Sequence, residues 1–344
     1  MLKVKSKNIN WADIDMAEIN LDKLLMHFSQ CMKSEGKSPS TITWYNEMIK
    51  RFTNFLKANN IEPVLGEFTI GAARDFVIHE QERKLSPYTI QARVRALKGF
   101  SSWLYGEKYT VENTLTILKI PKAPTKLVEP LTTEEIDLLV SVQNPLTVLG
   151  SRNLGVLTTL LGTGIRESEL SNLRSEDSHI EEGYIKVMGK GAKERVVPIG
   201  TVVQKTLWRY IFHFRPEPES DLDDYLFLTL DGKRLTSNAI KLLLNRWGKI
   251  AGVPRLHAHL CRHTFATNFL IHNCGDVFRL QQILGHTTLE MVRRYVHYAS
   301  TESMIKGHMS SPLDRMGIKN LKGYKVDRIL HENARRNRKN EDRH

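Results

Sequence analysis

Apolar residues recur every three or four positions along the first third of the chain, the spacing of a buried helix face. Four segments carry this pattern: residues 21–32, 37–56, 71–83 and 85–106. Capping residues stand where these segments begin, with Asn20 before the first, Ser38 or Ser40 at the second, and Ser86 followed by Pro87 at the fourth. These signals predict a small, all-helical N-terminal domain.

The pattern stops at LKIPKAPTKLVEP, which holds three prolines and no helical period, and we place a linker there. Directly after it, Thr132 and Glu135 have the spacing of a capping box and predict a new helix. The expected organisation is a helical domain at 15–117, a linker at 118–130, a second domain at 131–316 and a basic tail at 317–344.

The second domain mixes two periods. GYIKVM and ERVVPIG alternate like strands around the connector GKGAK, and they form its one convincing β segment, with a shorter strand-like stretch at 225–230. An apolar run from Asn153 breaks at Gly162 and Gly164, and Arg166 starts another helix. Further helices are expected at 202–212, 237–250 and 257–270. The predicted fold class is mainly α with a small β-sheet: an N-terminal helical domain followed by an α+β domain.

The net charge of the chain indicates what kind of partner it binds. The net charge is +12, and the basic residues recur throughout the chain, which fits an extended contact with nucleic acid better than a localised tail. In the second and fourth helices we place the basic residues off the apolar stripe, on a predicted DNA-binding face: Lys50, Arg51, Arg93, Arg95 and Lys98. The alternative is a solvated face on an ordinary helical bundle.

Three widely separated cysteines, Cys31, Cys261 and Cys274, form no disulfide framework. No apolar run approaches the roughly 20 residues that span a bilayer, and the N-terminus lacks the apolar core of a signal peptide. We expect a cytoplasmic protein with no membrane partner.

The candidate chemistry gathers near the end of the second domain. His259 and Arg262 are three residues apart and share one helix face. His286 follows Gly285, which suits a tight loop, and Tyr295 lies on a second amphipathic run. A cation, a proton carrier and a phenol on neighbouring elements suggest phosphate chemistry.

Five short motifs stand in order along the second domain. They are TGIRESEL with Arg166, GKGAKERVVPIG with Lys190, HLCRHTFAT with His259 and Arg262, LGHTT with His286, and RYVHYA with Tyr295. This series resembles the tyrosine recombinase, or phage integrase, family, especially its compact Xer-like bacterial members. The resemblance covers roughly residues 15–310 and implies a core-binding domain that binds DNA, a linker and a catalytic domain.

Elementary chemistry agrees with that resemblance. Displacement at a phosphodiester builds negative charge on the non-bridging oxygens, so a site without a metal needs fixed cations, and we assign Arg166 and Arg262 to this clamp. No GxxxxGK[ST] motif for ATP is present, so a covalent intermediate must conserve the bond energy, and Tyr295 is the expected nucleophile. Its phenol, with an ordinary pKa of about 10, must lose a proton during attack, and His259 is a candidate acceptor.

The resemblance supplies the remaining roles. It gives Lys190, on a hairpin, the protonation of the departing 5′-oxygen, and His286 a hydrogen bond to the phosphate. It implies a 3′-phosphotyrosyl intermediate, a free 5′-hydroxyl and no cofactor or catalytic metal. The partners would be double-stranded DNA and a homo-tetramer on paired sites, in the bacterial cytoplasm at the nucleoid. The target sequence, accessory proteins and the event served (integration or excision of a mobile element, resolution or inversion) stay open.

Each residue also has a plainer interpretation. Arg166 could simply pair with Glu169, Lys190 could be a solvated turn residue, and Tyr298 is a rival nucleophile one turn from Tyr295. A zinc site is a further alternative for the group of His257, His259, Cys261, His263 and Cys274. Acidic residues such as Glu176, Asp177 and the 221–224 loop could hold a metal in a nuclease, although Asp177 better matches an acidic family position that orients its neighbours.

Two other functions use a similar scaffold. A DNA-binding regulator could retain the recombinase fold without its chemistry, and a type IB topoisomerase would cleave one strand without a partner. The basic tail at 317–344 could dock on a neighbouring subunit, touch DNA or remain solvated.

Overall fold

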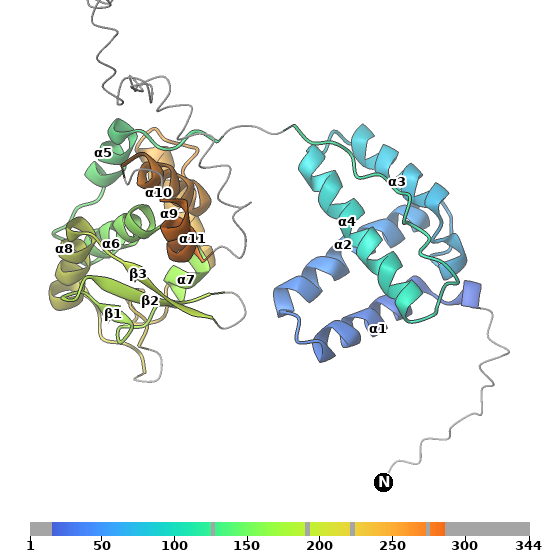
Figure 1. Ribbon diagram of the computed structural model, residues 1–344, viewed down its shortest axis with the longest axis horizontal. Helices are drawn as coiled ribbons and strands as arrows, with labels where there is room; N and C mark the ends of the chain where they lie inside the picture. Colours follow the sequence, from blue (N-terminus) through green and yellow to red (C-terminus); the bar gives the residue numbers. More distant parts are fainter. Residues whose placement is uncertain (1–15, 125–127, 190–192, 221–223, 273–275, 286–344) are drawn as a thin grey trace, which may run out of the picture. The chain divides into compact units, whose positions relative to one another are not determined.

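The computed structural model describes residues 16–124, 128–189, 193–220, 224–272 and 276–285, which are mostly helical with one small sheet (Figure 1). The chain divides into two compact units, Met1–Lys126 and Leu127–His344. The predicted fold class is confirmed. Within the described ranges, none of the helices combines the length and apolar character that crossing a bilayer requires.

The part of unit 1 that the structure describes contains four α-helices, preceded or separated by short 3₁₀ turns at Met16–Glu18 and Leu65–Glu67. The helices are α1 (Leu21–Ser34), α2 (Pro39–Ala58), α3 (Ile70–Glu82) and α4 (Pro87–Gly106). The predicted caps Asn20 and Ser86 are confirmed, and Ser38 is the serine that caps α2, where its hydroxyl accepts from the Thr41 N–H at 3.2 Å. Thr69 caps α3 in the same way.

Aromatic side chains fill the core of unit 1. Phe52 and Phe100 are fully buried, and Phe52 packs edge-on against Phe68 and Phe76, each with ring centroids 5.5 Å apart. Such geometry lets one ring's positive edge meet its neighbour's negative face. The apolar stripes read from the sequence therefore meet in one cluster that joins all four helices.

Two of the five residues predicted to form the basic DNA-binding face make contacts within unit 1 instead. Arg93 is only 5% exposed and its guanidinium contacts the buried Glu80 of α3. The ammonium of Lys98 donates to the carbonyls of Leu115, Thr116 and Leu118 at 2.9, 2.7 and 3.0 Å. Arg93 thus has no surface from which to reach a phosphate, and Lys98 holds the segment after α4 against that helix.

Unit 2 surrounds a central helix with other helices and a three-stranded antiparallel sheet in the order β1-β2-β3. Its elements are α5 (Thr133–Ser141), α6 (Val148–Thr163), α7 (Glu167–Ser171), β1 (Ser178–His179), β2 (Tyr184–Met188), β3 (Glu194–Pro198), α8 (Thr201–Arg209), a π-helical turn (Tyr210–Phe214), α9 (Ser237–Ile250), α10 (Ala258–His272) and α11 (Val277–Leu284). Thr132 and Glu135 form the predicted capping box of α5. β2 pairs with β3 so that Ile185 faces Val197, and both are buried.

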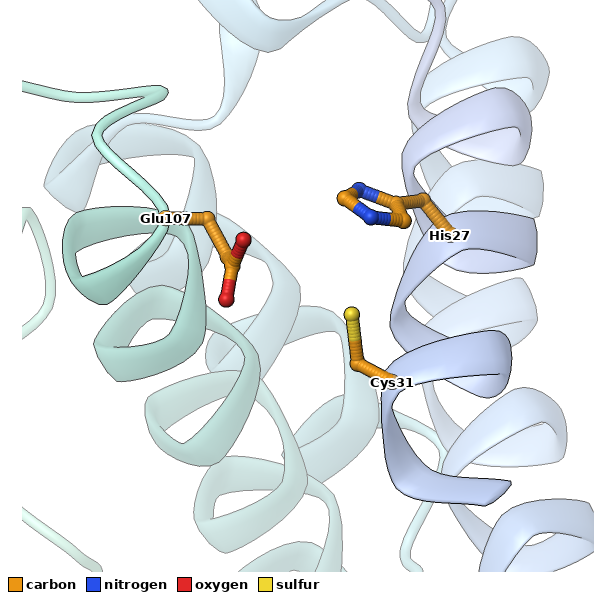
Figure 2. A group of neighbouring side chains, drawn as sticks. All are labelled: His27, Cys31 and Glu107. Carbon is orange, nitrogen blue, oxygen red and sulfur yellow. The ribbon is translucent and has the colours of Figure 1, made fainter. Parts of the chain in front are cut away.

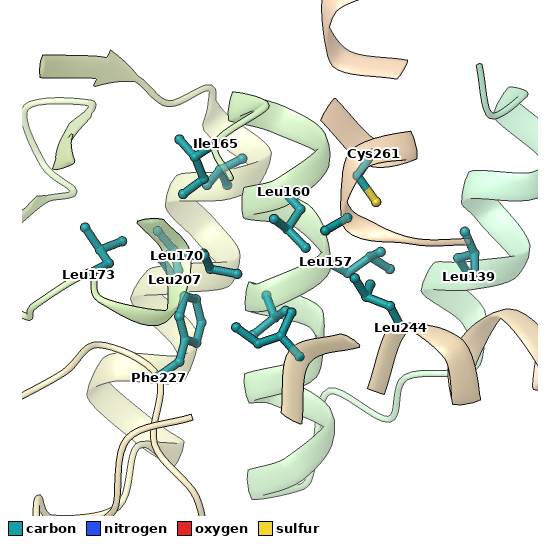
Figure 3. Packing of buried hydrophobic residues seen from close by; sticks show 14 of the residues in the cluster. Leu139, Leu157, Leu160, Ile165, Leu170, Leu173, Leu207, Phe227, Leu244 and Cys261 are labelled. Carbon is teal, nitrogen blue, oxygen red and sulfur yellow. The ribbon is translucent and has the colours of Figure 1, made fainter. Parts of the chain in front are cut away.

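α6 lies at the centre of the core of unit 2. Figure 3 shows Leu157 and Leu160 of this helix, both fully buried, among apolar side chains from the surrounding elements. α6 contacts both α8 and α10. This core fixes where α7 and α10 begin, and these two helices carry the candidate chemistry.

Four local predictions need correction. α6 begins at Val148, earlier than the apolar run suggested, because Thr147 caps it by accepting from the Gly150 N–H at 3.1 Å. β1 adds a third strand, residues 225–230 form only isolated bridges, and α11 follows α10 where no helix was predicted. Asp276 caps α11 and Gly285 ends it, and both are ordinary helix signals.

Candidate active site

Arg166 stands at the point where the chain enters α7. Its backbone N–H donates to Glu169 Oε2 at 2.8 Å, and its Nη1 donates to Glu169 Oε1 at 2.8 Å. The Arg166 side chain is nevertheless 36% exposed, while that of Glu169 is only 4% exposed. Glu169 therefore holds one edge of the guanidinium and leaves the group facing solvent, as an anion-binding arginine requires.

A second guanidinium completes the surroundings of Glu169. Arg195 of β3 donates through Nη1 and Nη2 to the two carboxylate oxygens at 2.9 and 2.8 Å. Burial alone raises the pKa of Glu169, but the hydrogen bonds and charges of Arg195 and Arg166 outweigh it, so the pKa lies below its ordinary value of 4.5. Glu169 is thus a fixed anion between two arginines.

Arg195 also touches the segments that precede two predicted site residues. Its Nε donates to the carbonyl of Ile283 at 2.7 Å. A Cβ added to Gly189 would lie 3.4 Å from Arg195 Nη1, and one added to Gly285 would lie 3.1 Å from Arg195 Nε. These two glycines directly precede Lys190 and His286. Arg195 therefore links the end of β2 and the end of α11 to Glu169, the carboxylate that also holds Arg166.

Arg262 is the buried cation of the site. It is 2% exposed, and its Nη1 and Nη2 donate to the carbonyls of Gly164 and Leu284 at 2.7 and 2.8 Å. Both acceptors lie at helix C-terminal ends, α6 for Gly164 and α11 for Leu284, where carbonyls lack helical partners and attract positive charge. The guanidinium is thereby fixed by backbone on two sides.

Three of the six predicted catalytic residues share one pocket of about 500 Å³. It lies between the start of α7, one face of α9 and the start of α10, and its lining comprises Arg166, Glu167, Ser168, Lys241, Asn245, Leu256, His257, Ala258, His259 and Arg262. His259 is exposed at the mouth, whereas Arg262 reaches it from the core. Lys190, His286 and Tyr295 lie outside the described residues, as do Tyr298 and Cys274.

Part of this pocket is formed by residues that no sequence motif indicates. Lys241 and Asn245 lie one turn apart on α9, and Lys241 Nζ is 3.0 Å from Glu167 Oε1. Their spacing on an exposed helix face was visible in the sequence, but nothing there placed this face opposite Arg166. In the sequence, Glu169 is only a possible ion-pair partner of Arg166, and nothing there places Arg195 beside Arg166.

The described residues around the pocket do not support the zinc alternative. Cys261 is fully buried in the core, and burial raises the pKa of its thiol to about 12, so it stays protonated at neutral pH. His263 points elsewhere, to the carbonyl of Val128. The acid that touches Arg166 is Glu169, not Asp177, and Asp224 of the acidic loop pairs with Arg215.

Both units of the chain have relatives among known proteins. Residues 129–302 match the phage integrase family, and residues 24–111 match the N-terminal SAM-like domain of phage integrases. The tyrosine recombinase XerC of Bacillus pumilus (strain SAFR-032) is 31% identical over 297 residues, which cover 85% of this chain and 96% of that protein. The chain belongs to the phage integrase family of tyrosine recombinases. The recombinase is also 32% identical, over 281 residues, to XerC of Oceanobacillus iheyensis, covering 80% of this chain and 92% of that one.

Solved structures share the fold. XerH recombinase bound to palindromic difH substrate, in a post-cleavage complex, has a TM-score of 0.65 at 23% identity, covering 79% of this chain and 80% of that chain. The Tn1549 transposon integrase in complex with circular intermediate DNA has a TM-score of 0.64 at 20% identity, covering 83% and 99%. The family match and the two XerC relatives confirm the predicted family, and this recombinase is an enzyme that cleaves and rejoins DNA at specific sites.

Proposed function

We propose that the pocket on unit 2 holds the scissile phosphate of a double-stranded DNA target. The observation that carries this proposal is the meeting of Arg166, His259 and Arg262 in one pocket. Two guanidiniums match the geometry of phosphate oxygens, and both are positioned before DNA arrives, Arg166 by Glu169 and Arg262 by backbone carbonyls. Lys241 would add a cation on the rim.

Tyr295 is the proposed nucleophile. Its phenolic oxygen forms a bond to phosphorus as the bond from phosphorus to the 5′-oxygen breaks, giving a 3′-phosphotyrosyl link and a free 5′-hydroxyl. His259 accepts the phenolic proton, Lys190 donates a proton to the departing 5′-oxygen, and His286 donates a hydrogen bond to the phosphate. Attack by a 5′-hydroxyl of the partner strand reverses these bond changes and joins the new strand. This chemistry uses no metal or nucleotide.

Glu169 and Arg195 act in this scheme as positioning residues. Their contacts with Arg166, Gly189 and Gly285 support a role in fixing the backbone directly before Lys190 and His286. Neither needs to touch DNA, because a carboxylate held by two arginines can orient the one that does. Arg195 contributes its fork of donors, which a lysine cannot reproduce.

The remaining parts of the proposal concern assembly. Unit 1 would bind duplex DNA through the exposed Lys50, Arg51 and Arg95, with Arg93 and Lys98 left out for the reasons given above. We assign residues 15–117 to this DNA-binding domain, 118–130 to the linker, 131–316 to the catalytic domain and 317–344 to a basic tail. Four copies would act on two paired sites, in the cytoplasm at the nucleoid.

A nicked suicide substrate tests the proposed phosphate clamp. Once the strand beside the nick is cut, a short fragment diffuses away and the covalent protein–DNA complex accumulates on a denaturing gel. Arg166→Lys and Arg262→Lys each keep a positive charge but lose the guanidinium fork, so trapping should slow by about 100-fold or more. Lys249→Gln, at the end of α9, is the control and should trap at the normal rate. Normal trapping by both arginine variants would refute the assigned clamp.

A further inference from the structure

Three side chains of metal-ligand type meet on unit 1. Figure 2 shows His27 and Cys31 of α1 and Glu107, just after α4, pointing toward one another. One ligand atom from each residue lies within 4.8 Å of the other two. We propose that this group binds a zinc ion, a property separate from the strand-exchange chemistry proposed for unit 2.

The local structure explains why the three groups converge. His27 and Cys31 are four residues apart on α1 and therefore share one helix face. Glu107 is the C-cap of α4, and its backbone N–H donates to the Trp103 carbonyl at 2.9 Å, which fixes the main chain while the side chain stays exposed. Tetrahedral zinc with bonds of about 2.0–2.3 Å places its ligands roughly 3.5 Å apart. Rotation of the exposed Glu107 side chain can supply the required closing movement.

The imidazole of His27 is already oriented as a metal ligand would be. Its Nδ1 lies 2.9 Å from the Tyr109 hydroxyl, and its ring packs edge-on to Trp103 with centroids 5.3 Å apart. With the proton on Nδ1 donated to Tyr109, the lone pair of Nε2 is available for a metal. Metal-binding histidines commonly donate their other ring N–H to an oxygen in this way.

The donor set selects the kind of ion. A thiolate, an imidazole and a carboxylate together favour zinc over magnesium or calcium, which prefer oxygen ligands alone. Cys31 is partly exposed, unlike the fully buried Cys261. Three protein ligands leave one position for water, which makes the site open and its ion exchangeable. Bound zinc would join α1 to the end of α4 and stabilise unit 1.

Cobalt binding to the full-length, untagged protein tests the site, because a Cys–Co²⁺ bond gives a thiolate-to-metal absorption band in the near ultraviolet. We expect one Co²⁺ per chain, displacement by Zn²⁺ with loss of the band, and a higher thermal midpoint in Zn²⁺. Cys31→Ser should lose the band. His27→Gln and Glu107→Gln should bind Co²⁺ at least about tenfold more weakly.

Matched variants separate this site from other ligands. Glu112→Gln removes an exposed acid five residues further along the chain and Cys274→Ser a different thiol, and both should bind Co²⁺ normally. Circular dichroism checks that Cys31→Ser is folded, and Glu107→Gln changes only an exposed side chain. The proposal fails if the normal protein gives no band, if the band persists in folded Cys31→Ser, or if Glu107→Gln binds Co²⁺ as tightly as the normal protein.

Discussion

At the scale of single residues, the site depends on charges that other charges hold in place. Glu169 is buried between Arg166 and Arg195, and the paired hydrogen bonds lower the pKa of its carboxyl. A buried pair of this kind is costly to break, because removing one partner leaves the other charge uncompensated. The ion pairs of Glu169 with Arg166 and Arg195 therefore stabilise unit 2 and also orient Arg166.

Arg195→Lys tests the positioning role. The lysine keeps the charge but cannot bond both oxygens of Glu169 and the Ile283 carbonyl, so Arg166 and the segments before Lys190 and His286 should lose their fixed positions. We expect covalent trapping to slow by about 10- to 100-fold. DNA affinity, measured in parallel by gel shift, should change by less than about threefold, since Arg195 contacts no phosphate in the proposal. The neighbouring Glu194→Gln is the control, and a purely structural role for Arg195 would instead lower binding and trapping together.

His263 predicts a dependence of stability on pH. Burial lowers its pKa below the ordinary 6.5, partly offset by the hydrogen bond to the Val128 carbonyl and reinforced by the charge of His259. The unfolded chain therefore takes up a proton at higher pH than the folded chain does. The free energy of unfolding should be greatest above pH 6.5 and fall as the pH drops from there toward the folded-state pKa.

His263→Gln provides the comparison for that effect. The glutamine amide can still donate to the Val128 carbonyl but does not titrate, so denaturant titrations of this variant should show a flatter pH profile below 6.5 than the normal protein. Parallel profiles for the two proteins would mean that other groups cause the loss of stability.

Residue chemistry could be predicted from the sequence only where a motif carried it. Arg166, His259 and Arg262 were predicted and do share a pocket, because spacing along α10 and the glycines before α7 are local features. Arg195, Lys241 and the burial of Arg93 could not be predicted in that way. Each depends on which distant element packs opposite, and a single sequence contains no local signal for that.

At the scale of elements, the end of α6 is closely packed beside the site. Gly164 has a φ of +63°, and a Cβ there would lie 2.4 Å from the Phe265 ring, while its carbonyl accepts from Arg262. Gly164→Ala should lower the free energy of unfolding by roughly 2–5 kcal/mol, combining backbone strain with overpacking. Denaturant titration measures this loss.

Gly252→Ala is a matched control for Gly164→Ala. Gly252 has a similar φ of +72° but nothing within 4 Å of an added Cβ, so only the strain of about 1–2 kcal/mol applies. Equal losses for the two variants would show that the contact with Phe265 is unimportant.

Helices with strong caps and a clear stripe were predictable, and shorter elements were not. α1, α2, α4, α5 and α9 begin where Asn20, Ser38, Ser86, Thr132 and the 237–250 pattern indicated. β1 has two residues and forms only because β2 lies beside it. Within residues 225–230, Leu226, Phe227 and Leu228 are buried in the core, whereas Leu230 is exposed. The apolar run therefore reflects burial of its middle residues and not pairing in a sheet, since the segment forms only isolated bridges.

At the scale of the whole molecule, the excess of basic residues should appear in the salt dependence of DNA binding. If Lys50, Arg51 and Arg95 each neutralise a phosphate, changing all three to glutamine should alter the salt dependence. The slope of the logarithm of the DNA-binding constant against the logarithm of the salt concentration should become shallower by about 2–3. Lys57→Gln, whose charge is paired with Asp22 at 3.1 Å, should leave the slope nearly unchanged. A combined variant with the normal slope would place the phosphate contacts of unit 1 elsewhere.

The most direct measurement identifies the residue that becomes joined to DNA. The trapped complex can be digested with protease and nuclease, and mass spectrometry can then locate the nucleotide on the peptide. We predict a 3′-phosphate linked to the oxygen of Tyr295, and no covalent complex with Tyr295→Phe, while Tyr298→Phe still forms one. A nucleotide on Tyr298 or on any other residue, or continued trapping by Tyr295→Phe, would contradict the proposed mechanism.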